Sequence, residues 1–226
     1  MPSKQAGINM YGIHDVALSP LEESVINMAI VSAIVVALIK GERRLEDRNT
    51  FAMLSLLAIF GVSGRILLEP IPNVQPVTVI VLLAGIYFGA PRAIALSGII
   101  ALSSNLILLG HGPWTLFQVI GWGAVGLIGA LLSEHLLKEG RLELNRVALV
   151  SIVSAFMFDW IVSLSILLNT DASFLMPYLV NGLLFDLYHA VGNLVFVAWI
   201  ANPMGEIKLR HRMEPRNKAV SQVATS

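Results

Sequence analysis

The stretch GRILLEPIPNVQPVTVIVLLAGIYFG, residues 64–89, places Arg65 near the end of one apolar run and starts a second run directly after a turn with three prolines. Apolar runs that approach about 20 residues are long enough to cross the hydrocarbon core of a bilayer. An ionised side chain at that depth is costly unless it has a partner or lines a water-filled cavity. The partners of Arg65 must therefore be sought in the rest of the chain.

Composition indicates the class of protein. Only 13% of the residues are charged, and the mean hydropathy is +0.75. A soluble domain carries about 25% charged residues, so these values predict an all-α integral membrane protein with several spans. The chain has no cysteine, which excludes disulfides and thiolate metal sites.

Hydropathy predicts seven helices, over residues 20–40, 51–68, 75–89, 92–109, 115–137, 147–168 and 177–200. The glycines of GWGAVGLIGALL, residues 121–132, are typical of closely packed membrane helices. The expected organisation is an extracytoplasmic segment (1–19), a first transmembrane helix (20–40), a six-helix membrane core (51–201) and a disordered cytoplasmic tail (202–226).

The distribution of Lys and Arg predicts the orientation. In a seven-span chain, thirteen of the fifteen basic residues fall on one side, in segments 40–48, 90–92, 138–146 and 208–218. The other side holds only Lys4, and Arg65 lies within a helix. Because basic loops stay in the cytoplasm, we expect a multi-pass protein of the cell membrane with its N-terminus outside and its C-terminus inside. The bilayer is an expected partner, whereas nucleic acid is not.

Polar residues of several helices share the depth of Arg65. Counting about 1.5 Å per residue from the helix ends brings Asn105, Asp159 and Asp186 to nearly the same level in the outer half of the membrane. Other polar and aromatic residues gather there. The predicted outward-facing site, for a small polar-aromatic or amphiphilic solute, comprises Arg65, Asn73, Gln75, Asn105, Trp114, Gln118, Trp122, Asp159, Asp186 and His189.

Structural roles compete with this interpretation. Arg65 and one of the two aspartates can form an ion pair that only stabilises the bundle. Trp114 suits the interfacial aromatic belt, and Asn105 suits a hydrogen bond between helices. His189 and Asp186 are three residues apart, but no third ligand is evident, so no metal site and no cofactor are predicted.

Three short motifs resemble one family of membrane proteins. They are Gly64-Arg65-Ile66, then Pro72-Asn73-Val74 with Pro76, and then Gly112-Pro113-Trp114-Thr115. Their order and spacing are similar to those of the S components of energy-coupling factor (ECF) vitamin transporters, in the branch that includes cobalamin-type S components. The resemblance covers roughly residues 51–200.

This resemblance implies a fold and a function. It implies a six-helix S-component core, to which residues 20–40 would add a seventh helix. S components capture a vitamin or related micronutrient on the outer face and then associate with a transmembrane coupling subunit and two cytoplasmic ATPases. Cobalamin or a corrinoid precursor is the first expected solute. The chain has no phosphate-binding loop, so ATP hydrolysis would come from those partners.

The docking helix is left open by the sequence. In many S components an alanine-x-x-x-alanine pattern of the first core helix contacts the coupling subunit. Here that helix carries a looser pattern of small residues, whereas the additional helix carries the regular one. The candidate docking residues are Ala29, Ala33, Ala37, Ala52, Ser55 and Ala58.

Other functions fit less well. A retinal protein needs a lysine in its last helix, and an intramembrane hydrolase needs a nucleophile beside a base; neither pattern is evident, so we expect no enzyme. The better alternative is a stand-alone, proton-coupled secondary transporter that uses Arg65 with Asp159 or Asp186.

Overall fold

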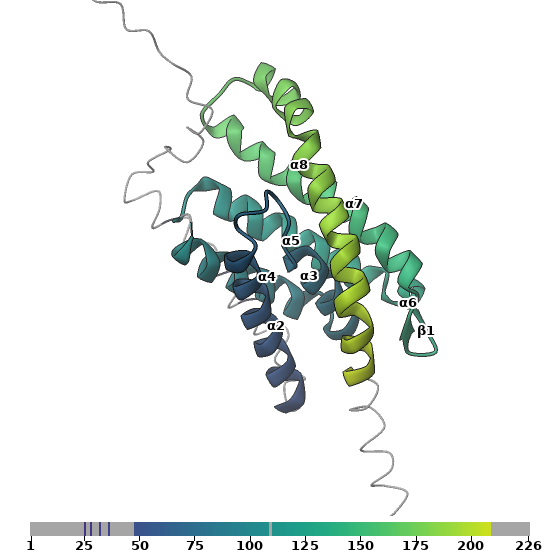
Figure 1. Ribbon diagram of the computed structural model, residues 1–226. Helices are drawn as coiled ribbons and strands as arrows, with labels where there is room; N and C mark the ends of the chain where they lie inside the picture. Colours follow the sequence, from purple (N-terminus) through teal and green to yellow (C-terminus); the bar gives the residue numbers. More distant parts are fainter. Residues whose placement is uncertain are drawn as a thin grey trace, which may run out of the picture.

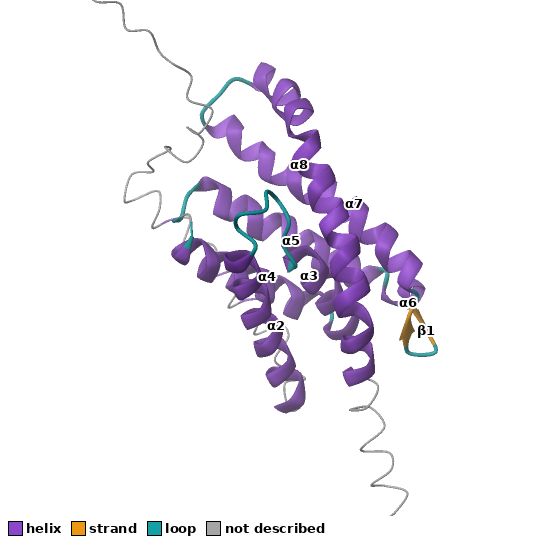
Figure 2. Ribbon diagram, in the orientation of Figure 1, coloured by secondary structure: helices purple, strands orange, loops and turns teal. Residues whose placement is uncertain are grey.

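A computed structural model describes residues 48–108 and 110–208, together with Val25, Met28, Ser32 and Val36. Most of this part is helical (Figures 1 and 2). The α-helices are α2 (Arg48–Leu67), α3 (Val77–Phe88), α4 (Ala90–Ile107), α5 (Pro113–Leu131), α6 (Ser133–Leu136), α7 (Leu144–Ser163) and α8 (Leu175–Phe196). The 3-10 segments η2 (Leu164–Leu168) and η3 (Ala172–Phe174) join α7 to α8, and a π-helical segment, η4 (Val197–Ala201), follows α8.

Five helical stretches of the described residues are long and apolar enough to cross a membrane: Thr50–Leu67, Ala90–Ile107, Pro113–Leu131, Leu144–Leu168 and Ala172–Lys208. The protein is thus an all-α, multi-pass membrane protein, as the composition predicts. Each stretch corresponds to one of the predicted helices. The predicted helix at residues 75–89 is present as the shorter α3.

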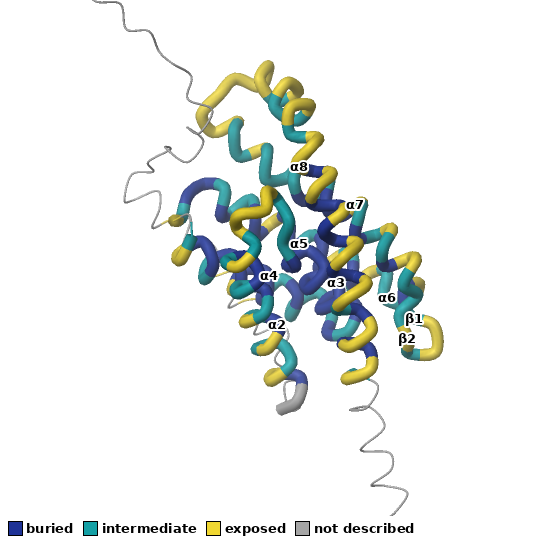
Figure 3. Tube along the Cα trace, viewed as in Figure 1, coloured by how far each residue is buried: buried dark blue, intermediate teal, exposed yellow. Residues whose placement is uncertain are grey.

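The centre of the bundle is α3, which packs against α2, α4, α5, α7 and α8. Eleven of its twelve residues are buried (Figure 3). A helix of this length is only about 18 Å long, well short of the ~30 Å hydrocarbon core. Its neighbours shield α3 from lipid, which explains why its sequence is apolar on every side.

Glycines bring α3 and α5 into backbone contact. A Cβ atom on Gly85 would lie 2.1 Å from the carbonyl oxygen of Gly126, and one on Gly129 would lie 2.3 Å from that of Leu82. No side chain fits at either distance. The prediction that the glycine-rich helix serves close packing is therefore confirmed.

We expect Gly129→Ala to lower the free energy of unfolding by about 1–3 kcal/mol, because the new methyl group must push α5 away from α3. Thermal unfolding of the purified, detergent-solubilised protein measures this change. The matched control is Gly123→Ala on the same helix, where the nearest atom lies 3.8 Å from the new Cβ. Equal melting temperatures for the two variants would contradict the close-packing account.

Two boundaries differ from the prediction. The helix predicted to run to residue 137 is α5 followed by the short α6, and a hairpin of β1 (Leu137–Lys138) and β2 (Arg141–Leu142) follows. The two turn residues, Glu139 and Gly140, have φ angles of 54° and 82°. Two consecutive positive φ angles are what a two-residue hairpin turn needs.

The last helix is longer than predicted. Residues 202–208 are α-helical, so a disordered tail starting at residue 202 is wrong for these seven residues. Pro203 is tolerated because η4 interrupts the regular hydrogen-bond ladder immediately before it. The proline then falls in the first turn of a new α-helical stretch, where its missing N–H is not needed.

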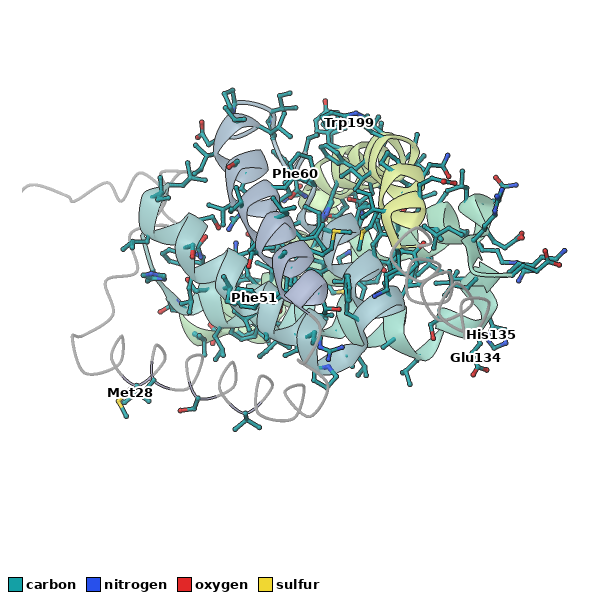
Figure 4. All side chains as sticks on the ribbon, turned by 90° about the horizontal axis from the view of Figure 1, so that it is seen from below. Met28, Phe51, Phe60, Glu134, His135 and Trp199 are labelled. Atoms are coloured by element: carbon teal, nitrogen blue, oxygen red, sulfur yellow. The ribbon has the colours of Figure 1, made fainter. Side chains whose placement is uncertain are left out.

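The outer surfaces of α2 and α8 expose large apolar side chains, as a lipid-facing surface requires. Figure 4 shows Phe60 of α2 and Trp199 of η4 close together, and their ring centroids are 6.0 Å apart. Trp199 is 64% exposed. These rings therefore bring α2 and η4 into contact.

The candidate docking residues have different environments. Ala52 is exposed on α2, while Ser55 and Ala58 are half-buried. Ala29, Ala33 and Ala37 lie outside the described residues, as does most of the predicted helix 20–40. The four described residues of that segment are helical and exposed.

Candidate functional site

Arg65 binds three side chains of its neighbours rather than an acid. Its Nε atom donates to Oε1 of Gln75 at 2.9 Å. Its Nη1 atom donates to Oδ1 of Asn105 at 2.9 Å and to the hydroxyl of Ser104. The Arg65 side chain is almost completely buried. The ion pair of Arg65 with Asp159 or Asp186 is not formed among the described residues.

Asn105 connects this arginine to α5. Its Nδ2 atom donates to Oγ1 of Thr115 at 3.0 Å and to Oε1 of Gln118 at 2.8 Å. Asn105 is fully buried, and both ends of its amide are bonded. The residue thus holds α2, α4 and α5 together around one positive charge.

A second polar chain crosses from α5 to α7. The indole N–H of Trp122 donates to Oγ1 of Thr78 at 3.1 Å, and this oxygen lies 2.8 Å from Nε2 of His189. Nδ1 of His189 lies 2.9 Å from Oδ2 of Asp159. The same Oδ2 atom accepts from Nδ2 of Asn73 at 3.1 Å. The chain thus links α5, α3, α8, α7 and the loop 68–76.

The hydrogen-bond roles in this chain follow from its acceptors. An ionised carboxylate only accepts, so Nδ1 of His189 carries the proton that Asp159 receives. Thr78 accepts from Trp122 and has one hydroxyl proton left, which Nε2 of a neutral His189 can accept. Each group is then satisfied.

Thr78, His189 and Asp159 repeat the hydroxyl–imidazole–carboxylate order of a catalytic triad. The sequence does not reveal this arrangement, because the three residues are far apart along the chain and come together only in the fold. However, Thr78 and His189 have no exposed surface, and the Thr78 hydroxyl is enclosed by Trp122 and His189. In this conformation the hydroxyl is out of reach of a substrate, and the three side chains serve as a link between helices.

Thr78→Val tests that link. The isosteric change leaves the indole N–H of Trp122 and Nε2 of His189 without partners, at a cost of about 1–3 kcal/mol. We expect a correspondingly lower free energy of unfolding, measured by thermal unfolding and by Trp fluorescence. Thr170→Val, in the exposed loop after α7, is the matched control. Equal effects of the two substitutions would mean that the Thr78 hydroxyl is not part of a stabilising chain.

Stacked side chains join the two polar groups. The guanidinium carbon of Arg65 lies 5.1 Å from the ring centroid of Trp122, and the ring of Phe158 stacks on Trp122 at 4.5 Å. Phe158 also makes an edge contact with His189 at 5.5 Å. The structure therefore brings eight of the ten predicted residues into one network: Arg65, Asn73, Gln75, Asn105, Gln118, Trp122, Asp159 and His189.

Asp186 and Trp114 lie beside this network. Oδ2 of Asp186 accepts from the indole N–H of Trp160 at 3.0 Å, and Asp186 is within electrostatic range of Asp159 and His189. Trp114 is half-buried and folds back over Gly112 at the start of α5. Asp186 is thus bonded to Trp160 of α7, and Trp114 covers the start of α5.

The loop 68–76 is held to the bundle at both ends. A Cβ atom on Gly64 would lie 2.3 Å from the Pro76 ring, so only glycine permits this contact. Asn73 has a φ angle of 57°, which Asn tolerates better than most residues. Its amide donates to Asp159 and to the carbonyl oxygen of Phe185 at 3.0 Å. The loop thereby covers the polar network.

Sequence reasoning missed Thr78, Ser104, Thr115, Phe158 and Trp160. Thr115 stands in one of the three motifs that carry the family resemblance, and Ser104 directly precedes Asn105. Thr78 is the one aliphatic hydroxyl residue of the otherwise largely apolar α3, which is a signal for a hydrogen bond between helices. Phe158 and Trp160 flank Asp159, yet no periodicity distinguishes them from lipid-facing aromatics.

Metal ligation has no obvious donor set in this part of the chain. Among the described residues, no three side chains of His, Asp or Glu come together as metal ligands. The polar groups that converge are one guanidinium, amides, hydroxyls, indole N–H groups, one imidazole and two carboxylates. Such groups suit hydrogen bonding to a polar solute.

Comparison with known proteins gives a family without a described activity. No curated protein matches the chain. No solved structure matches it either. A family model described as "Family of unknown function (DUF6580)" matches residues 45–213, which is most of the chain and contains the whole network. The chain belongs to this family.

Proposed function

We propose that the protein is the substrate-capture subunit of an ECF-type importer, which binds a vitamin or related micronutrient on the outer face of the cell membrane. One observation carries the proposal: eight residues singled out in the sequence as a solute site, from five helices and one loop, form a single connected network. A purely lipid-facing bundle has no need of so many buried polar groups.

The proposed orientation places the network outside. The described loops near it, 68–76 and 108–112, contain no Lys or Arg, whereas the opposite end of the bundle carries Arg92, Lys138, Arg141, Arg146 and Lys208. This asymmetry supports a cytoplasmic position for that opposite end. The six helices from α2 to α8, excluding α6, would form the S-component-like core, with residues 20–40 as an additional span.

The proposed solute is vitamin-like, and corrinoids are the first compounds to test because the sequence motifs resemble the cobalamin-type branch. The side chains of Trp122 and Phe158 fill the centre of the network, where both are almost completely buried. A large macrocycle would therefore sit above the loop side of the network or require these rings to move. A smaller solute needs neither.

Calorimetric titration of the purified, detergent-solubilised chain against a vitamin panel, including cobalamin and cobinamide, tests the proposal. We expect submicromolar binding of one compound. Co-purification from the native membrane should also recover a transmembrane coupling subunit and two ATPases. A folded protein that binds none of the panel and purifies without those subunits would refute the proposed function.

A second candidate is a stand-alone, proton-coupled transporter. The observation that favours it is the 2.9 Å contact between His189 and Asp159, since an imidazole–carboxylate pair can carry a proton. Arg65 would then have an electrostatic role only. Solute uptake by the purified chain alone, in liposomes with a proton gradient, would support this candidate against the importer.

A further inference from the structure

Asp186 is a buried carboxyl group without a basic partner among the described residues. Its side chain is 5% exposed. Its bonded partner is the neutral indole of Trp160, and among the described residues no basic nitrogen lies within 4.0 Å of its carboxylate. The nearby His189 gives its Nδ1 proton to Asp159 instead. In its ionised form, a carboxylate in such surroundings is stabilised by a cation from outside the chain.

Trp160, the hydrogen-bond partner of this carboxylate, also lines an open groove. Its volume is about 630 Å³, within the usual range of small-molecule sites of about 300–1,000 Å³. One long face of α7 forms most of its wall, and α8 contributes Leu179. The lining is apolar apart from the indole N–H of Trp160. The groove therefore suits a hydrocarbon or aromatic body.

Trp160 joins the groove to the charge. It lines the groove, and its N–H holds Oδ2 of Asp186 at 3.0 Å. The side chain is 46% exposed, so part of its ring remains accessible. Indole faces attract cations, and a carboxylate at the ring edge strengthens that preference. The groove is thus apolar along α7, and Trp160 is the point in its lining where a positive charge is favoured.

We propose that this groove binds a solute with an apolar body and a cationic head, the body against α7 and the head beside Trp160 and Asp186. The proposal rests on the proposed function and names the class of solute. Asp159, which lies within electrostatic range of Asp186, adds a second negative charge and opposes an anionic head. An acyl chain of a lipid fits the groove but leaves Asp186 without a counter-ion.

Two isosteric probes test the charge preference on the unmodified full-length chain. They are 4-(trimethylammonio)phenol, which is a cation, and 4-tert-butylphenol, its neutral carbon analogue. Titration in a non-ionic detergent, followed by Trp fluorescence and calorimetry, gives both affinities. We expect the cation to bind at least tenfold more tightly. Equal affinities, or tighter binding of the neutral probe, would overturn the proposal.

Two variants locate the effect. Asp186→Asn should weaken binding of the cationic probe at least tenfold and leave the neutral probe unchanged. Trp160→Leu should remove the preference while keeping the apolar wall. Asp171→Asn, in the exposed loop before η3, is the matched control and should change neither affinity. If Asp186→Asn fails to fold, the affinities of the two probes for the unmodified chain still test whether the groove prefers a cation.

The vitamin panel separates this inference from the proposed function. A submicromolar panel compound without a cationic group, or one whose affinity Asp186→Asn leaves unchanged, overturns the inference and leaves the importer proposal standing. Preference for the cationic probe without any panel binder supports the inference and refutes the capture of the tested vitamins. Binding of neither panel compounds nor probes refutes both.

Discussion

Replacing Asn105 by leucine is expected to destabilise the protein by about 3 kcal/mol or more, the cost of breaking a buried polar network on one side. The substitution removes the amide oxygen that Arg65 donates to, and the two hydrogen bonds to Thr115 and Gln118. The guanidinium stays buried but loses one acceptor. Chemical or thermal unfolding in detergent measures the loss.

Asn193→Leu provides the comparison. Asn193 is also an asparagine without exposed surface between two helices, but it makes one hydrogen bond, to the carbonyl oxygen of Ser151 at 2.9 Å. Its Oδ1 atom has no partner in the described structure. We expect the free energy of unfolding to fall by about 0.6 kcal/mol, the average for a hydrogen bond between helices of a membrane protein. Comparable losses for the two variants would show that Asn105 does not support a buried charge.

Replacing Arg65 by lysine is the second large effect. Lysine keeps the positive charge but lacks the planar fork, so one ammonium group cannot reach Gln75 from one side and Asn105 from the other. Losing one or two hydrogen bonds of a charged donor costs about 1.5–3 kcal/mol each. If the network shapes the solute site, affinity for the panel compound falls about 100-fold.

The measurement is calorimetric titration of both proteins with the same compound, together with thermal unfolding. Arg92→Lys, at the opposite end of α4 from Asn105, is the control and should bind as the unmodified protein does. An Arg65→Lys variant with unchanged affinity and unchanged melting temperature would show that positive charge alone, without the guanidinium geometry, is sufficient at this position.

Much of the fold follows from hydropathy, because lipid requires continuous helices of a minimum length. The helix that departs most from the rule is α3, where burial by neighbours replaces length. The β1–β2 hairpin depends on positive φ angles at Glu139 and Gly140, and only Gly140 is a residue that signals such a turn. The continuation past Pro203 depends on a π-helical segment, which no residue pattern announces.

The sequence predicts the depth of the site residues in the membrane but not which of their side chains are in contact. Counting along the helices put Arg65, Asn105 and Asp159 at one level, and they do lie in one network. Depth carries no rotational information, so the sequence favoured a contact between Arg65 and an aspartate. In the structure, amides and hydroxyls surround Arg65, and His189 takes the contact with Asp159. The rotation of each helix about its own axis decides which of these side chains come into contact.

The short α3 has a consequence for how the chain enters the membrane. A helix that inserts into a bilayer on its own needs about 20 apolar residues. The helix α3 has only 12 residues, too few for independent insertion. Only Gly89, with a φ angle of 83°, separates α3 from α4. We therefore expect the two helices to enter the bilayer together as a hairpin, with the longer α4 anchoring α3.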